Sequence, residues 1–145
     1  MFTLFKLILF YFYLNYNYFD IILINSYESD GQVIGKHSFV VINDEEGQIQ
    51  GLDYNIICNV MSSFKDEAHK NKKLSFPGNF PVTSSDSTVL FGNDKDGYIK
   101  AEQFYFFNKE KTSFTVIGKM NPDVFKLLIK FIKDQPNIKY IIDNL

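Results

Sequence analysis

The stretch from Gly35 to Ile42 constrains the fold of this 145-residue chain more than any other. It reads Gly-Lys-His-Ser-Phe-Val-Val-Ile, and its β-branched and aromatic residues predict a strand. Side chains alternate along a strand, so His37, Phe39 and Val41 face one way and the residues between them face the other. Both faces are largely apolar, which indicates an interior strand. His37 stands at the entrance of this strand, where a polar side chain can reach a cleft.

A hairpin is predicted directly after this strand. The polar segment 43–47 ends in glycine, and apolar residues return in segment 48–52. A short polar loop between two such runs is typical of an antiparallel hairpin. We therefore expect segment 48–52 to pair with the strand that contains His37.

Further along the chain the pattern is mixed. Segment 55–61 is apolar and fits a short helix or a strand, and its period does not decide between them. Segment 62–73 is polar and rich in lysine, which is typical of a solvated helix or loop. The prolines of segment 76–81 predict irregular structure, which would divide the domain into two halves. The other predicted strands are residues 19–26, 88–91, 98–107 and 113–119. The last three of these would form a β-meander.

The clearest helix begins at Pro122. Asn121 is a good N-cap, proline suits the first helical position, and Asp123 suits the positive end of the helix dipole. Apolar residues repeat on one face, with lysines on the opposite face, until Pro136. The predicted fold class is therefore α+β, a mainly antiparallel sheet with this C-terminal amphipathic helix packed on one face.

Composition narrows the possible functions. The net charge is −2, so the protein has no general basic surface for nucleic acid. All fifteen basic residues are lysine, so no arginine can contact a phosphate in a bidentate manner. We therefore expect no nucleic-acid partner. The chain has one cysteine, Cys58, and two histidines, His37 and His69. This inventory excludes an internal disulfide and a multi-cysteine zinc site, and we expect no metal and no cofactor. His69, which lies among lysines, is predicted to be a surface residue.

Residues 1–18 are predicted to be a hydrophobic leader, an anchor or a mis-assigned start. An apolar run follows Lys6 and resembles the start of a secretory signal, although it is shorter than the ~20 residues that span a bilayer and no small-residue cleavage site follows. A signal or membrane-inserted anchor, a buried first element and a mis-assigned start all fit this pattern. The first of these would make the protein secreted or membrane-anchored. Residues 19–145 are predicted to form a single domain, truncated at the C-terminus if the chain is a fragment.

A short acidic segment resembles part of a calcium-binding loop. Aligning Gly97 with the EF-hand glycine places Asp94 and Asp96 at ligand positions. However, Gly92 and Gln103 stand where acidic ligands belong, and strands are predicted on both sides. A plain turn is therefore the favoured interpretation.

The order of elements resembles a known superfamily. The strand Gly-Lys-His-Ser-Phe-Val-Val-Ile, the acidic turn, the strand ending in Gly51-Leu52-Asp53, the meander and the strand-plus-helix of residues 114–128 are similar to the circularly permuted branch of the papain-like hydrolases. That branch includes lecithin:retinol acyltransferase-like proteins and bacterial amidase or lipase effectors. The resemblance covers roughly residue 21 to the C-terminus.

This resemblance implies a Cys/His hydrolase-like domain of the amidase or acyl-transfer class, acting on a peptide, cell-wall or lipid substrate. His37 would be the general base and Asp53, or a backbone carbonyl, the acceptor that orients it. The superfamily carries its nucleophilic cysteine on a helix after the region equivalent to residues 125–142. The resemblance therefore leaves three alternatives: the chain is a fragment of a longer protein, such as an exported bacterial effector, the nucleophile has been lost, or Cys58 takes its role. In this chain Cys58 is the one cysteine, and its apolar surroundings predict a buried side chain rather than a nucleophile.

A non-catalytic protein is the alternative hypothesis. The aromatic run Phe104-Tyr105-Phe106-Phe107 could present a surface to a protein partner, as in a β-rich binding or inhibitor-type protein, or it could be core. The residue pattern leaves both hypotheses open.

Overall fold

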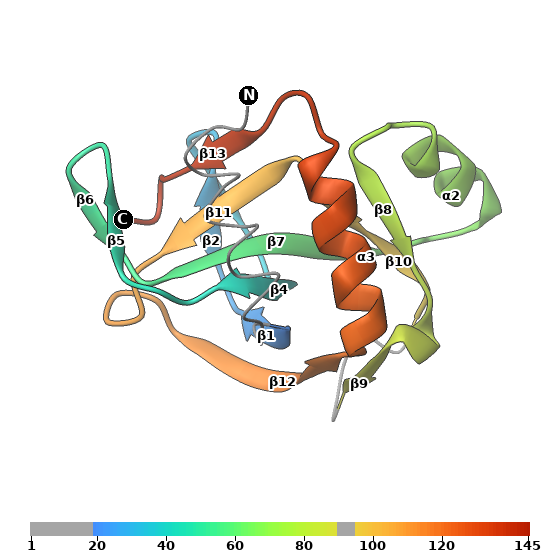
Figure 1. Cartoon of the computed structure of the whole chain (residues 1–145), viewed down its shortest axis with the longest axis horizontal. Helices are drawn as coiled ribbons and strands as arrows, with labels where there is room; N and C mark the ends of the chain where they lie inside the picture. The colour runs from blue at the N-terminus through green and yellow to red at the C-terminus, as the bar shows by residue number, and fades with distance from the viewer. Residues whose placement is uncertain (1–18, 90–94) are drawn as a thin grey trace.

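A computed structural model describes residues 19–89 and 95–145 of the chain (Figure 1). The predicted leader, residues 1–18, and part of the EF-hand-like segment, including Asp94, lie outside the described residues. The helices are α2 (Glu67–Leu74), α3 (Pro122–Lys133) and the 3-10 turn η1 (Ser84–Asp86). The strands are β1 (Asp20–Ile24), β2 (Tyr27–Ser29), β3 (Gln32–Ile34), β4 (His37–Asn43), β5 (Gly47–Ile49), β6 (Leu52–Tyr54), β7 (Ile56–Ser63), β8 (Asn79–Val82), β9 (Ser87–Val89), β10 (Gly97–Lys100), β11 (Gln103–Phe107), β12 (Phe114–Met120) and β13 (Lys139–Ile141).

The main sheet confirms the α+β fold class. Its strands follow the order β13-β11-β7-β4-β1-β12-β9, and β10 continues the line of β11 beside β7, with β8 outside it. Every pairing in this sheet is antiparallel except that of β11 with β13. The strand that contains His37 lies between β1 and β7, as its two apolar faces predicted.

The predicted pairing of segment 48–52 with β4 is wrong. Segment 48–52 does not pair with β4; β5 and β6 form their own two-stranded hairpin around Gln50 and Gly51, both at positive φ. On the side away from β1, the partner of β4 is β7, and the two pair from Ser38 with Met61 to Asn43 with Ile57. A strand that is apolar on both faces needs neighbours of the same kind, and residues 56–61 are all buried whereas segment 48–52 is too polar.

Two further predictions need correction. The irregular segment 76–81 contains the start of β8, where Pro81 is tolerated because β8 is an edge strand. The predicted meander does not form, because β12 pairs with β1 and β9 whereas β11 pairs with β7 and β13.

The predicted long strand 98–107 is bent in the middle. Ala101 and Glu102 form a turn between β10 and β11. Asn59, which is fully buried on β7, donates from Nδ2 to the carbonyls of Lys100 (3.4 Å) and Gln103 (2.9 Å) on either side of this turn. These bonds satisfy backbone oxygens that a continuous ladder would have used, and they hold Lys100 in place.

The helix α3 covers one face of the sheet, as predicted (Figure 1). Asn121 caps it by accepting a hydrogen bond from the backbone N–H of Asp123 (2.9 Å). Four of its side chains are buried in a core cluster that also contains residues from seven strands of the sheet: Phe125, Leu128, Ile129 and Ile132. Within residues 19–89 and 95–145, no helix has the length and apolar character needed to cross a membrane.

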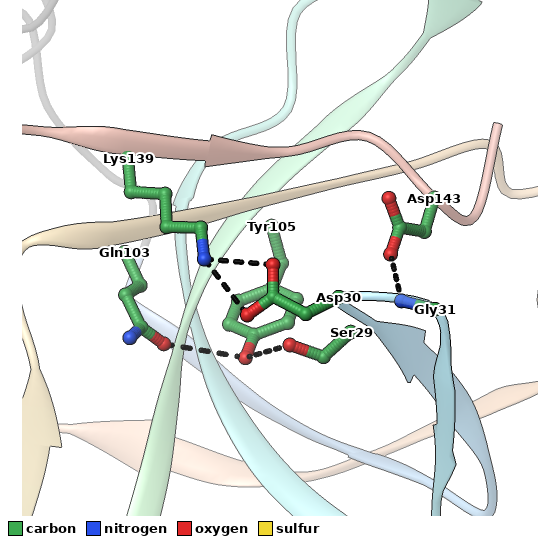
Figure 2. A network of polar contacts seen from close by, with 7 residues as sticks. All are labelled: Ser29, Asp30, Gly31, Gln103, Tyr105, Lys139 and Asp143. Carbon is green, nitrogen blue, oxygen red and sulfur yellow. Dashed lines mark hydrogen bonds and ion pairs between the residues drawn. The ribbon is translucent and has the colours of Figure 1, made fainter.

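The other face carries an aromatic cluster beneath the β2–β3 hairpin. Tyr27 packs edge-on against Phe39 (5.0 Å between ring centroids) and Tyr105 (5.5 Å). Polar contacts tie the hairpin to β13 and the residues after it: Lys139 donates to both carboxylate oxygens of Asp30 (2.7 Å each), and Asp143 accepts from the N–H of Gly31 (3.2 Å) (Figure 2). The hairpin is thereby fixed over the aromatic cluster.

This packing predicts a loss of stability in alkali. Burial, and to a smaller extent the Tyr105 phenol, raises the pKa of Tyr27 above its usual range. The folded state therefore keeps a proton that the unfolded chain loses, so the stabilisation is complete below about pH 10 and declines as the pH rises further. We expect the free energy of unfolding, measured in urea, to fall less steeply above this pH in Tyr27→Phe than in wild type. Equal slopes would show that Tyr27 ionises as freely in the fold as in the unfolded chain.

Candidate functional site

A basic cleft opens at the end of the sheet where β4 begins and β7 ends. Its volume is about 620 Å³. The lining residues come from β1, the start of β4, the end of β7, the following loop, α2 and β10: Leu23, Lys36, His37, Ser38, Met61, Ser62, Ser63, Lys65, His69, Lys73, Tyr98 and Lys100. Both histidines of the chain and four of its fifteen lysines therefore line one cleft.

Strand register places the floor of the cleft. One step beyond the pair Ser38–Met61, His37 lies opposite Ser62, and Ser62 pairs with Tyr98 on β10. Directly opposed residues share a face of the sheet, so these three side chains form a row across three strands. At ~4.8 Å per strand, the Cα atoms of His37 and Tyr98 are roughly 10 Å apart. Lys100, two residues after Tyr98, lies on the same face.

Gly97 permits the close approach of β7 and β10 at this point. A Cβ atom on Gly97 would collide with the carbonyl oxygen of Ser62. Only glycine fits there without displacing backbone, so the identity of this residue fixes how near Tyr98 and Lys100 lie to Ser62.

The wall of the cleft is α2. Asp66 caps this helix by accepting a hydrogen bond from the N–H of His69 (2.7 Å). The His69 ring lies 6.3 Å from the Tyr98 ring, and the Lys73 ammonium lies 6.0 Å from the Tyr98 ring centroid. Tyr98, which is only 4% exposed, also stacks on Phe64 at 5.5 Å. A buried aromatic residue thus anchors the helix that carries His69 and Lys73.

The charged side chains that line the cleft are all positive among the described residues. None of the described residues that line it is acidic, and none of its four lysines lies within 4.0 Å of a carboxylate of another described residue. Burial, and then the charge of Lys73, lowers the pKa of Lys100, while Glu102 partly opposes this effect. Lys73 and Lys100 are both half-buried. The fold therefore brings like charges together in a partly desolvated place, which costs free energy when no anion is present.

His37, the predicted general base, lines this cleft. It is half-exposed, its Nδ1 lies 3.2 Å from the carbonyl oxygen of Gly35, and its ring packs edge-on to Tyr27 (5.9 Å). The acceptor that orients the ring is thus the backbone carbonyl and not Asp53. Asp53 is exposed on β6, where it accepts a hydrogen bond from Gln48 Nε2 (2.7 Å) and lines a different hollow.

Cys58 does not belong to this site. It is fully buried in the aromatic and aliphatic cluster on β7, and burial raises the pKa of its thiol above the usual range. Cys58 is four residues before Ser62, so at ~3.3 Å per residue it lies roughly 13 Å along the strand from His37. A Cys58–His37 dyad would need hydrogen-bond distance, and the register does not allow it.

Sequence reasoning missed His69 and overvalued the aromatic run. His69, predicted to be a surface residue, is half-buried against Tyr98 and lines the cleft. Phe104, Tyr105, Phe106 and Phe107 are at most 3% exposed, so they are core and present no surface to a partner. Among the described residues there is no group of three or more potential metal ligands. The signal that could have found the cleft is that both histidines directly neighbour lysines, although in segments far apart in the chain.

Comparisons with known proteins return no relative: no family model, no curated protein and no solved structure matches this chain. The relationship to the permuted papain-like hydrolases therefore stays a prediction, and the function must be argued from the cleft.

Proposed function

We propose that this protein binds a small anionic ligand in the basic cleft. The observation that carries the proposal is the convergence of Lys36, Lys65, Lys73, Lys100 and both histidines on one cleft whose described lining contains no carboxylate. An anion placed there would relieve the repulsion between Lys73 and Lys100 and would replace water lost by burial.

The chemistry of the lining indicates the kind of ligand. Lysine ammonium groups act as point charges with three donors and do not impose the planar fork of arginine. Phosphate, sulfate and carboxylate groups all suit such a site. The volume of about 620 Å³ falls within the range typical of small-molecule sites.

The hydrolase hypothesis keeps one supporting feature, which is His37 in a cleft with its Nδ1 on a backbone carbonyl. Cys58, the one cysteine of the given chain, is buried elsewhere and does not supply the thiol that acyl transfer would use. Binding is therefore the function that the geometry of the described residues supports best.

Neutralising the half-buried lysine should weaken binding. We expect Lys100→Gln to bind inorganic phosphate about tenfold less tightly than wild type at low ionic strength, measured by isothermal titration calorimetry, because one charge-assisted contact is lost. Added salt should weaken binding to both proteins, since the attraction is electrostatic.

Lys126→Gln is the matched control. Lys126 is exposed on α3 and does not line the cleft, so its removal changes the net charge by the same amount. Its affinity for phosphate should stay within about twofold of wild type. Equal losses in the two variants would attribute binding to overall charge and contradict a site in the cleft.

A further inference from the structure

The two histidines of the cleft are held in opposite tautomers. A carbonyl oxygen can only accept a hydrogen bond, so the contact of His37 Nδ1 with the Gly35 carbonyl (3.2 Å) places the proton on Nδ1. A backbone N–H can only donate, so the contact of Lys65 N with His69 Nδ1 (3.1 Å) leaves that nitrogen without a proton. In the neutral rings, Nε2 of His37 is therefore an acceptor and Nε2 of His69 is a donor.

Neither Nε2 atom has a hydrogen-bond partner among the described residues. The other groups that face the cleft are the ammonium groups of Lys36, Lys65, Lys73 and Lys100, serine hydroxyls and Tyr98. With both rings in these neutral tautomers, the lining offers several cationic donors, a donor on His69 and an imidazole acceptor on His37. A bare oxyanion can satisfy the donors, but it has no hydrogen to give to His37.

Resting on the proposed anion binding, we propose that the ligand is an oxyanion that also carries a hydroxyl group, and that His37 selects it by accepting that hydroxyl's hydrogen bond. Hydrogen phosphate is a simple ligand of this kind, with one P–O–H and three other oxygens for the lysines and His69. Sulfate has the same charge and shape but no hydrogen. A fully deprotonated anion would leave the His37 Nε2 lone pair against an oxygen lone pair, so that this acceptor stays unpaired and binding is weakened.

The test compares inorganic phosphate with sulfate by calorimetric titration of the full chain under mildly alkaline conditions, where phosphate is mainly the hydrogen phosphate dianion and matches the charge of sulfate. For wild type we expect phosphate to bind at least about tenfold more tightly than sulfate. His37→Phe keeps a ring against Tyr27 and has no nitrogen, so it should bind both anions with similar affinity. His69→Phe is the matched control; it should weaken both anions alike and keep the preference for phosphate.

A second pair of ligands distinguishes a hydroxyl on phosphorus from one on carbon. Glycerol 1-phosphate and propyl phosphate carry the same anionic group, and only the former has free hydroxyls. A preference for glycerol 1-phosphate that His37→Phe abolishes would identify a carbon-borne hydroxyl, and a preference confined to inorganic phosphate would identify the P–O–H group. Both results support the role of His37.

The outcomes separate this inference from the proposed function. If wild type binds none of these anions, the proposed function is wrong. If it binds phosphate and sulfate equally and Lys100→Gln weakens both, anion binding stands and the selective role of His37 is overturned. Retention of the preference in His37→Phe, with circular dichroism showing the native fold, also overturns it.

Discussion

Leu128→Ala is expected to lower the free energy of unfolding by about 2–5 kcal/mol. Leu128 is fully buried at the centre of the apolar face of α3, in the cluster that joins the helix to the sheet. Truncation removes buried methyl groups and leaves a cavity that close-packed neighbours fill only in part. The measurement is urea denaturation, in which the midpoint should fall while the dependence of the free energy on urea stays the same.

Leu127→Ala provides the control on the same helix. The side chain of Leu127 is 58% exposed, so the same substitution one position earlier should change the free energy of unfolding by no more than about 0.5 kcal/mol. A midpoint that does not move in Leu128→Ala would show that α3 is not docked on the sheet as described. Equal shifts in the two variants would point to helix propensity rather than packing.

Alkylation of Cys58 is expected to be at least about 1000-fold slower in the folded protein than in urea-unfolded chain at neutral pH. The thiol is fully buried on the central strand β7, and burial raises its pKa, so both access and thiolate formation are suppressed. Modification then requires opening of the sheet, which only a small fraction of molecules undergo at any moment. Mass spectrometry of the iodoacetamide adduct against time measures this ratio.

His37→Ala distinguishes a buried thiol from an activated one. Because His37 lies roughly 13 Å along the strand from Cys58, its removal should leave the labelling rate of the folded protein unchanged once any change in stability is subtracted. Fast labelling of wild type that disappears in His37→Ala would show a Cys/His pair and would restore the hydrolase hypothesis.

Local signals in the sequence predicted local structure well. The cap at Asn121, the proline that follows it and the apolar period after it predicted α3, because capping and amphipathicity depend on residues within a few turns. The two apolar faces of β4 likewise predicted an interior strand. Strand pairing was harder to predict. The pairing of β4 with β7 and of β11 with β13 depends on which distant strands bury one another. In addition, the short β5–β6 hairpin around Gln50 and Gly51 lies in the connection between β4 and β7.

The candidate site was predictable only in part, for the same reason. His37 could be placed at the entrance of an interior strand from the sequence around it. His69 and Lys73 looked like surface residues because their segment is lysine-rich, and only the packing of α2 against Tyr98 brings them to His37's end of the sheet. The net charge of −2 averages over the chain and hides four lysines gathered in one cleft.

The most direct test of the central claim is a titration of isotope-labelled protein with inorganic phosphate, followed by amide and imidazole NMR signals. Binding in the basic cleft predicts saturable shifts that are largest at His37, Ser62 and His69, with little change at residues of the β5–β6 hairpin at the far end of the sheet (Figure 1). Lys100→Gln should require about ten times more phosphate for the same shifts. Small, non-saturating shifts scattered over the lysines of the whole surface would contradict a binding site in this cleft.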